Sequence, residues 1–117
     1  MTQSPDCPFC RIVAGQVLAT IVYKDDLVTA FRDINPQAPT HILLVPNHHV
    51  AGMNEFAEGD ANALTAILLA AREIARKEGI ADSGYRLVAN QGRDAGQSVF
   101  HLHFHLLGGR RMKWPPG

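Results

Sequence analysis

The stretch HLHFHLLGGR, residues 101–110, contains three of the six histidines of the chain at every second position and ends in Gly-Gly-Arg. In an extended strand alternate side chains share a face, so the histidines are predicted to lie on one face and the apolar residues between them on the other. The two sets are His101, His103 and His105, and Leu102, Phe104 and Leu106. The outer histidines of such a strand lie roughly 13 Å apart, whereas zinc holds imidazole nitrogens at about 2 Å. One metal ion cannot bind all three, so different roles are expected for them.

The composition predicts a single domain, residues 1–117, that acts on a small molecule. The apolar content is 46%, and 11 Lys and Arg balance 11 Asp and Glu. Without a basic run there is no electrostatic footprint of a nucleic-acid binder, so nucleic acid is not an expected partner. No apolar stretch is long enough to span a bilayer, and residues 1–4 contain no signal-peptide apolar region, so no membrane partner and a cytoplasmic location are expected.

The remaining sequence predicts an α+β fold, with an antiparallel sheet of about five strands, one long helix and one short helix. Helical spacing of apolar residues predicts the long helix at residues 59–78, and a short helix is expected at residues 9–14. The strands are predicted within residues 20–33, with a turn at Asp25-Asp26, and at residues 41–46, 85–90 and 99–107. Such a succession of strands with one long helix favours helices on one face of the sheet.

The loop NQGRDAGQS, residues 90–98, directly precedes the histidines. Backbone N–H groups of glycine-bearing turns form anion-binding nests, and Ser98 adds a hydroxyl donor, so phosphate is the candidate anion. For the loop alone, a plain hairpin turn whose glycines adopt positive φ angles is the alternative.

Two chemistries fit three neighbouring imidazoles. In one, His103 attacks phosphorus and forms a phosphohistidine-type intermediate. In the other, a His-x-His pair binds a zinc ion that activates water. Histidines that are merely solvated on a half-buried strand are the third alternative, which three copies in register disfavour.

The stretch GQSVFHLHFHLLGGR resembles the signature of the histidine triad (HIT) superfamily. Three further stretches, YKDDLVTAFRDINPQAPTHILLVP, YRLVANQGRDAGQS and the terminal WPPG, resemble its Hint branch of nucleoside phosphoramidases, so the resemblance covers nearly the whole chain. It implies hydrolysis of a purine nucleoside 5'-phosphoramidate, such as AMP joined to an amine, through a covalent nucleotidyl-histidine. The alternatives are a dinucleoside polyphosphate hydrolase, which the WPPG ending disfavours, and a nucleotide-binding regulatory protein.

The resemblance also implies a role for each matching residue. His103 would be the nucleophile, His105 would meet the developing charge and the phosphate oxygens, and His41 would orient or tune the triad. The expected phosphate-binding residues are Asn90, Gly96, Gln97 and Ser98. The expected nucleoside-binding residues are Phe9, Ile12, Val17, Phe31, Asp33 and Ile34, with the Asp33 carboxylate accepting the ribose hydroxyls. A turn cap for Asp33, and ordinary core packing for the apolar residues, are the alternatives.

Cys7 and Cys10, the only cysteines, form a Cys-x-x-Cys sequence that the eukaryotic Hint pattern lacks and many other HIT proteins carry with a structural zinc. A two-residue gap lets both thiolates reach one tetrahedral ion, and two imidazoles complete a Cys₂His₂ set. The resemblance assigns these imidazoles to His49 and His101, with His48 as the alternative to His49. The zinc would be structural, no cofactor would be required for catalysis, and two buried free cysteines are the metal-free alternative.

A two-fold homodimer is the expected assembly. Trp114 follows the last strand, and Pro115 and Pro116 cannot extend a sheet or a helix, so the indole needs an outside surface to bury against. The resemblance implies a sheet continued across the dimer, with the segment 110–117 and its Trp114 near the partner's active site. A disordered tail with an exposed indole is the alternative.

Overall fold

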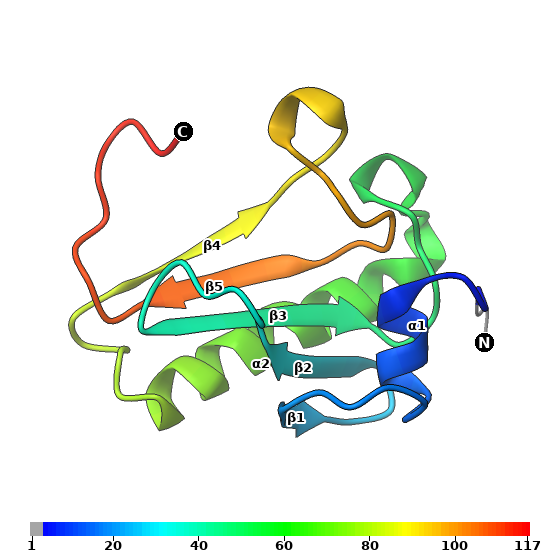
Figure 1. Cartoon of the computed structure of the whole chain (residues 1–117), viewed down its shortest axis with the longest axis horizontal. Helices are drawn as coiled ribbons and strands as arrows, with labels where there is room; N and C mark the ends of the chain where they lie inside the picture. Colours follow the sequence, from blue (N-terminus) through cyan, green and yellow to red (C-terminus); the bar gives the residue numbers. More distant parts are fainter. Residues whose placement is uncertain (1–3) are drawn as a thin grey trace.

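The computed structural model describes residues 4–117, in which five antiparallel strands form one sheet with a long helix packed across one face (Figure 1). The strands are β1 (Ile21–Lys24), β2 (Val28–Arg32), β3 (Thr40–Pro46), β4 (Tyr85–Ala89) and β5 (Phe104–Gly108). The helices are α1 (Pro8–Val13) and α2 (Ala61–Lys77), and the short 3₁₀ turns are Met53–Glu55, Glu58–Asp60 and Arg93–Ala95. The strand order is β1-β2-β3-β5-β4, so the last strand of the chain lies between β3 and β4. The predicted α+β fold is confirmed.

The helix α2 lies within the predicted range because its apolar residues follow a helical period. Ile67, Ala71 and Ile74 are buried against the sheet, where the helix contacts β1, β2 and β3. The helix ends in a Schellman motif, in which Gly79 adopts a φ of 75° and the N–H of Ile80 donates to the carbonyl of Ala75 at 3.0 Å. Gly79, which marked the end of the helix in the sequence, therefore ends it by adopting a left-handed backbone conformation.

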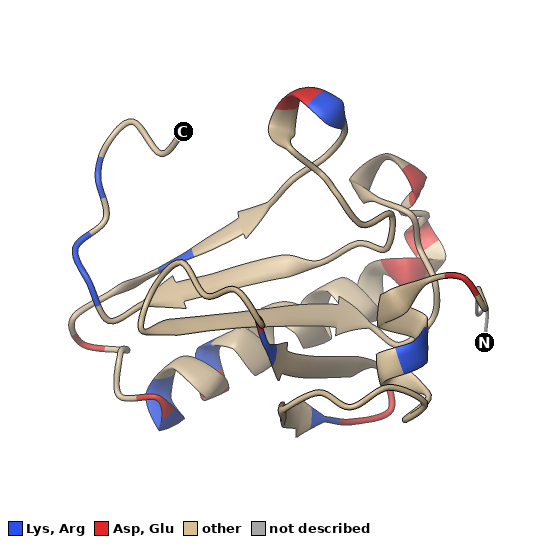
Figure 2. Ribbon diagram, viewed as in Figure 1, with Lys and Arg blue, Asp and Glu red and all other residues tan. Residues whose placement is uncertain are grey.

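The two faces of the sheet have different coverings. Val28, Ala30, Ile42, Leu44 and Leu106 are fully buried under α2. The opposite face is covered in part by the short helix α1, whose Phe9, Cys10 and Val13 pack on Phe31, Leu43 and Val45. The expectation that the helices lie on one face of the sheet was therefore wrong. Strands β3 and β5, at the centre of the sheet, carry no Lys, Arg, Asp or Glu (Figure 2). The partly covered face is the one that carries the histidines of β3 and β5.

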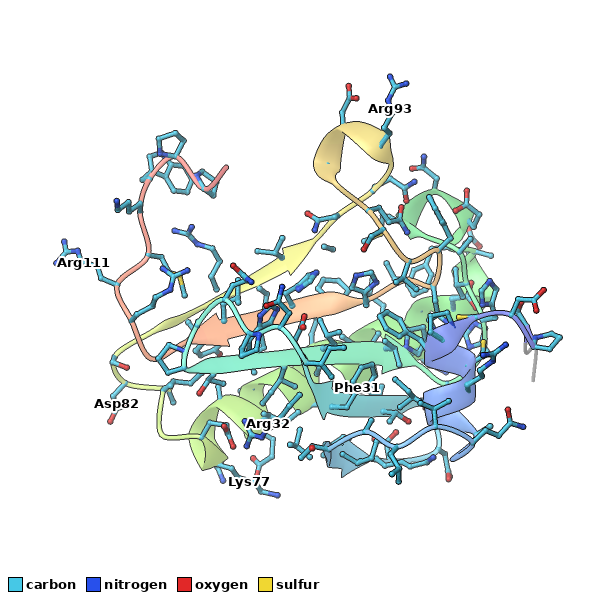
Figure 3. The ribbon with its side chains drawn as sticks, in the orientation of Figure 1. Phe31, Arg32, Lys77, Asp82, Arg93 and Arg111 are labelled. Carbon is cyan, nitrogen blue, oxygen red and sulfur yellow. The ribbon has the colours of Figure 1, made fainter. Side chains whose placement is uncertain are left out.

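The hairpin of β1 and β2 forms as predicted, and β3 follows it within one residue of its predicted bounds. β1 and β2 pair antiparallel, and the Asp25 carboxylate accepts the N–H groups of Leu27 and Val28 at 2.8 Å each, which closes the turn between the strands. At the end of β2, the Arg32 side chain extends towards the C-terminal end of α2 (Figure 3), where its two terminal nitrogens contact the Glu78 carboxylate at 2.9 Å. This pairing lowers the pKa of Glu78.

The last strand is shorter than predicted, because it begins at Phe104 rather than at residue 99. The N–H of Leu102 donates to the carbonyl of Val50 at 2.6 Å, so the segment before β5 is tied to the loop after β3 and not to a neighbouring strand. Of the three histidines, His105 alone lies in the strand. The predicted alternation holds within β5, where Leu106 faces α2 and His105 lies on the opposite face.

Among residues 4–117, no helix is both long enough and apolar enough to cross a membrane.

Candidate active site and cysteine–histidine cluster

A cavity of about 480 Å³ opens between α1, β2 and the segment before β5. Apolar side chains line most of it, and His103 and His105 lie in its wall. The structure brings together there all six residues predicted for the nucleoside, which are Phe9, Ile12, Val17, Phe31, Asp33 and Ile34. Leu18 and Leu43 also line the cavity and were not predicted. Leu43 follows His41 by two positions in β3, so strand alternation is a signal that places it on the same face.

His103 has one ring nitrogen committed to the backbone and the other available. Its side chain is 6% exposed, and its Nδ1 atom lies 2.8 Å from the carbonyl oxygen of His101. A carbonyl only accepts hydrogen bonds, so Nδ1 carries the proton and Nε2 of the neutral ring keeps its lone pair. The ring stacks edge-on against Phe9 and His105, with centroid distances of 5.0 Å each. This tautomer is the one that a nucleophilic imidazole requires.

His41 and His105 form a chain of hydrogen bonds with one direction. The backbone N–H of Gln37 donates to Nδ1 of His41 at 3.0 Å, so the proton of the neutral His41 ring is on Nε2. That Nε2 lies 2.9 Å from Nδ1 of His105, which must accept, so the proton of His105 is on its own Nε2. The two residues meet because β3 and β5 pair with Leu43 opposite His105, which makes His41 a diagonal neighbour on the same face.

Both of these histidines are neutral at pH 7. Burial, together with the nearby His103 and His41, lowers the pKa of His105 to about 4, against a smaller opposing effect of Asp33. Burial also lowers the pKa of His41, which the Asp33 carboxylate at 3.4 Å partly offsets. His105 is therefore a neutral N–H donor and not a cation.

The group Asp33, His41 and His105 has ligand atoms within 4.8 Å of one another, a spacing also found in metal sites. However, the Gln37 N–H keeps the proton on the His41 nitrogen that faces the other two residues. A metal ligand needs a lone pair at that atom, so the geometry favours a hydrogen-bonded network over a metal site.

The loop before the histidines is held mainly by Gln97. Its side-chain oxygen accepts the N–H of Gly92 at 2.9 Å, and its side-chain nitrogen donates to the carbonyls of Ala51 and Val99 at 2.9 and 3.2 Å. Of the four residues predicted to bind phosphate, Ser98 lines the cavity. Asn90 follows β4 and is half-buried, while the N–H groups of Gly96 and Gln97 bond to carbonyls within the loop. The glycines at 92 and 96 have positive φ angles of 83° and 82°, as the turn interpretation also requires.

Four further side chains meet behind this cavity, and we call Cys7, Cys10, His49 and His101 the cysteine–histidine cluster. Nδ1 of His101 lies 3.3 Å from Sγ of Cys7 and 3.5 Å from Sγ of Cys10, and Nδ1 of His49 lies 3.4 Å from Sγ of Cys10. Zinc bonds of about 2.0–2.3 Å in a tetrahedron place ligand atoms about 3.3–3.8 Å apart, so these separations fit the ion.

The surroundings of the cluster also fit a metal. Nε2 of His101 donates to the carbonyl of Pro46 at 2.9 Å, which leaves Nδ1 as the ligand atom, as is usual for metal-bound histidines. The N–H groups of Cys10 and Ser4 point at the sulfurs of Cys7 and Cys10, both at 3.4 Å. His48, the alternative ligand, instead contacts Asp60 at 2.8 Å. His49 is therefore the histidine of this pair that faces the cysteines.

Trp114 remains 83% exposed in the single chain. Its ring lies 6.0 Å from the guanidinium of Arg86, and Arg86 donates to the carbonyl of Lys113 at 3.1 Å. The contact of Trp114 with a second chain stays a prediction.

Comparison with known proteins identifies the family of the chain. The HIT domain family matches residues 14–112. A purine nucleoside phosphoramidase of Escherichia coli K12 is 51% identical over 104 residues, covering 89% of this chain and 87% of the relative. A 14 kDa zinc-binding protein of Zea mays is 48% identical over 111 residues, covering 93% and 86%. The crystal structure of a HIT family hydrolase from Legionella pneumophila superposes with a TM-score of 0.94 at 49% identity, covering 96% of this chain and all of the other. The chain belongs to the HIT domain family.

Proposed function

We propose that this chain hydrolyses purine nucleoside 5'-phosphoramidates, in which AMP or GMP is joined to an amine through a P–N bond. The observation that carries the proposal is the bond from Nδ1 of His103 to the carbonyl of His101, because it leaves Nε2 as a nucleophile in the wall of a mostly apolar cavity. The relative from E. coli, named a purine nucleoside phosphoramidase, supports the same chemistry.

The cavity accounts for binding of the nucleotide. Phe9 and Phe31 meet edge-on with a centroid distance of 5.4 Å and form part of an apolar wall suited to a purine base. The Asp33 carboxylate, which accepts the Asn35 N–H at 2.8 Å, would also accept the ribose hydroxyls. The phosphate would then lie between Ser98 and the two histidines of the cavity, His103 and His105.

The reaction would proceed in two displacements. Nε2 of His103 bonds to phosphorus as the P–N bond breaks, and the departing amine takes up a proton from solvent. Water then attacks phosphorus and loses a proton to solvent, the bond to His103 breaks, and AMP or GMP is released. While Nε2 is bonded to phosphorus the ring is positively charged, and the carbonyl of His101 stabilises its Nδ1–H. The neutral His105 donates its Nε2–H to a phosphate oxygen throughout.

We also propose that the cysteine–histidine cluster holds a structural zinc ion. The support is the set of sulfur–nitrogen separations of 3.3–3.5 Å and the similarity to a protein named as zinc-binding. When bound, zinc would cross-link α1 to the segment before β5. The ion would be structural, and catalysis would not require it. A homodimer that brings Trp114 to the partner's active site completes the proposal.

Mass spectrometry of protein quenched during turnover of an adenosine 5'-phosphoramidate tests the mechanism. We expect a mass increase of one adenylyl group on the peptide that contains His103. Turnover without an adduct, or an adduct on another residue, would contradict the assigned nucleophile.

A further inference from the structure

We propose that the cysteine–histidine cluster positions both the nucleophile and one wall of the nucleotide cavity, so that metal binding and nucleotide binding strengthen each other. This inference rests on the zinc site and the nucleotide cavity proposed above. It adds a thermodynamic link between them, which makes Phe9 and His101 positioning residues for the reaction.

The first connection runs through His101. Its side chain is fully buried and belongs to the cluster, while its backbone carbonyl accepts the Nδ1–H of His103 at 2.8 Å. The segment around His101 lies outside the strand ladder, so its path depends on individual contacts such as the bond from the Leu102 N–H to Val50. A bond to the His101 ring therefore restrains the carbonyl that sets the tautomer and orientation of His103.

The second connection runs through α1. Phe9 lies between Cys7 and Cys10 in one helical turn, and its ring contacts His103 at 5.0 Å and Phe31 at 5.4 Å between centroids. Pro8, Phe9 and Ile12 of this helix line the nucleotide cavity. A helix of six residues is far too short to be stable alone, so its place depends on what holds it to the rest of the chain.

A metal ion would strengthen the contacts within the cysteine–histidine cluster, which help to hold α1 and the segment before β5 in place. The cluster joins Cys10 of α1, and Cys7 at the N-cap of this helix, to His49 in the loop after β3 and to His101 before β5. Without a metal the four side chains are joined to one another by weak thiol–imidazole hydrogen bonds, whereas a tetrahedral ion would join them by four coordinate bonds. A rigid cluster would hold Phe9 and His103 in their binding positions before the nucleotide arrives. Nucleotide binding would then lose less conformational entropy, because fewer side chains remain to be ordered.

Coupling between two sites is reciprocal, and this gives the test. Calorimetric titration of AMP into zinc-loaded and chelator-treated protein should show at least about fivefold weaker binding without zinc. Zinc affinity, measured by competition with a chromophoric chelator, should rise by the same factor in saturating AMP. Circular dichroism establishes whether the zinc-free chain is folded.

The cobalt(II) form provides a measurement that does not depend on the zinc-free chain. Its visible absorption bands report on the geometry of the cluster, and AMP should shift them in the wild type. Phe9→Leu keeps all four ligands but loses the aromatic edge against His103, so it should bind one metal ion per chain and show a smaller shift and a smaller coupling factor. Phe56→Leu, in the loop between two 3₁₀ turns, is the matched control and should behave as wild type.

Three results would overturn the inference. The first is equal AMP affinity with and without zinc in a folded chain, and the second is cobalt bands that do not respond to AMP. The third is full coupling in Phe9→Leu. A chain that binds AMP but no zinc or cobalt would refute the proposed metal site itself, and with it the coupling. Metal binding without any AMP binding would instead refute the proposed function.

Discussion

The Nε2 atom of His41 lies 2.9 Å from the Nδ1 atom of His105, while the backbone N–H of Gln37 lies 3.0 Å from the other nitrogen of His41. The backbone N–H of Gln37 thus determines the direction of both hydrogen bonds in this row, from Gln37 to His41 and from His41 to His105. The last proton in it belongs to Nε2 of His105, a residue of the cavity wall. The tautomer of His105 is therefore set by a loop that precedes β3.

His105→Ala should lower kcat for an adenosine phosphoramidate by about 100-fold, because it removes a preorganised donor to the phosphate oxygens. The affinity for AMP should change much less, since the apolar cavity and Asp33 remain. Single-turnover kinetics together with calorimetric AMP binding separate the two quantities. An unchanged rate would remove His105 from the site.

His103→Ala should abolish turnover and leave AMP binding measurable, because the cavity does not need the nucleophile to hold the base and ribose. Rates and AMP affinity can be compared with those of His48→Ala, whose side chain contacts Asp60 outside the cavity. Loss of rate and loss of affinity by the same factor would argue against a nucleophilic role.

The stability of the fold should depend on pH through His105. Its pKa is about 4 in the folded chain and near 6.5 when unfolded, so between these values the unfolded chain binds a proton that the folded chain does not. The free energy of unfolding should therefore fall as pH is lowered from about 6.5 towards 4. His105→Asn, followed by urea denaturation across this range, should reduce the slope. An identical slope in the variant would show that other groups account for the dependence.

Gln97→Ala should destabilise the chain by about 1–3 kcal/mol, because it leaves the N–H of Gly92 and the carbonyl of Ala51 without their bonds from this side chain. We also expect a higher KM, since this amide holds the loop that leads to Ser98. Thermal denaturation and steady-state kinetics measure both effects. Gln16→Ala, at an exposed position, is a matched control that should change neither.

Deletion of residues 112–117 should change the preference among leaving amines more than the rate with one simple substrate, if the tail reaches the site of a partner. Trp114 is available for such a contact because it is 83% exposed in the single chain. Light scattering of the full-length chain should give the mass of a dimer. A monomeric mass, or unchanged amine selectivity after truncation, would refute the proposed assembly.

Much of the fold follows from local patterns in the sequence. The period of α2, the glycine at its end and the Asp25 turn depend on residues within a few positions of one another, and each forms as predicted. The predicted start of the last strand at residue 99 was wrong, because the alternation of apolar residues continues back to Phe100, although the backbone N–H of Leu102 bonds to Val50 and not to a neighbouring strand. Which partner a backbone N–H finds is decided by the path of a distant loop.

The sequence by itself determined the chemical groups of this protein: a histidine triad, a Cys-x-x-Cys pair and a set of apolar residues that now line one cavity. Only the tertiary structure decided their roles in space. It shows His101 turned into the cluster and His103 lining the cavity, although the two are separated by a single residue. It also shows Gln97 holding the loop and Gln37 directing His41. The physical reason is that a tautomer, a ligand set and a buried amide depend on contacts between groups as many as 94 residues apart, which no local pattern encodes.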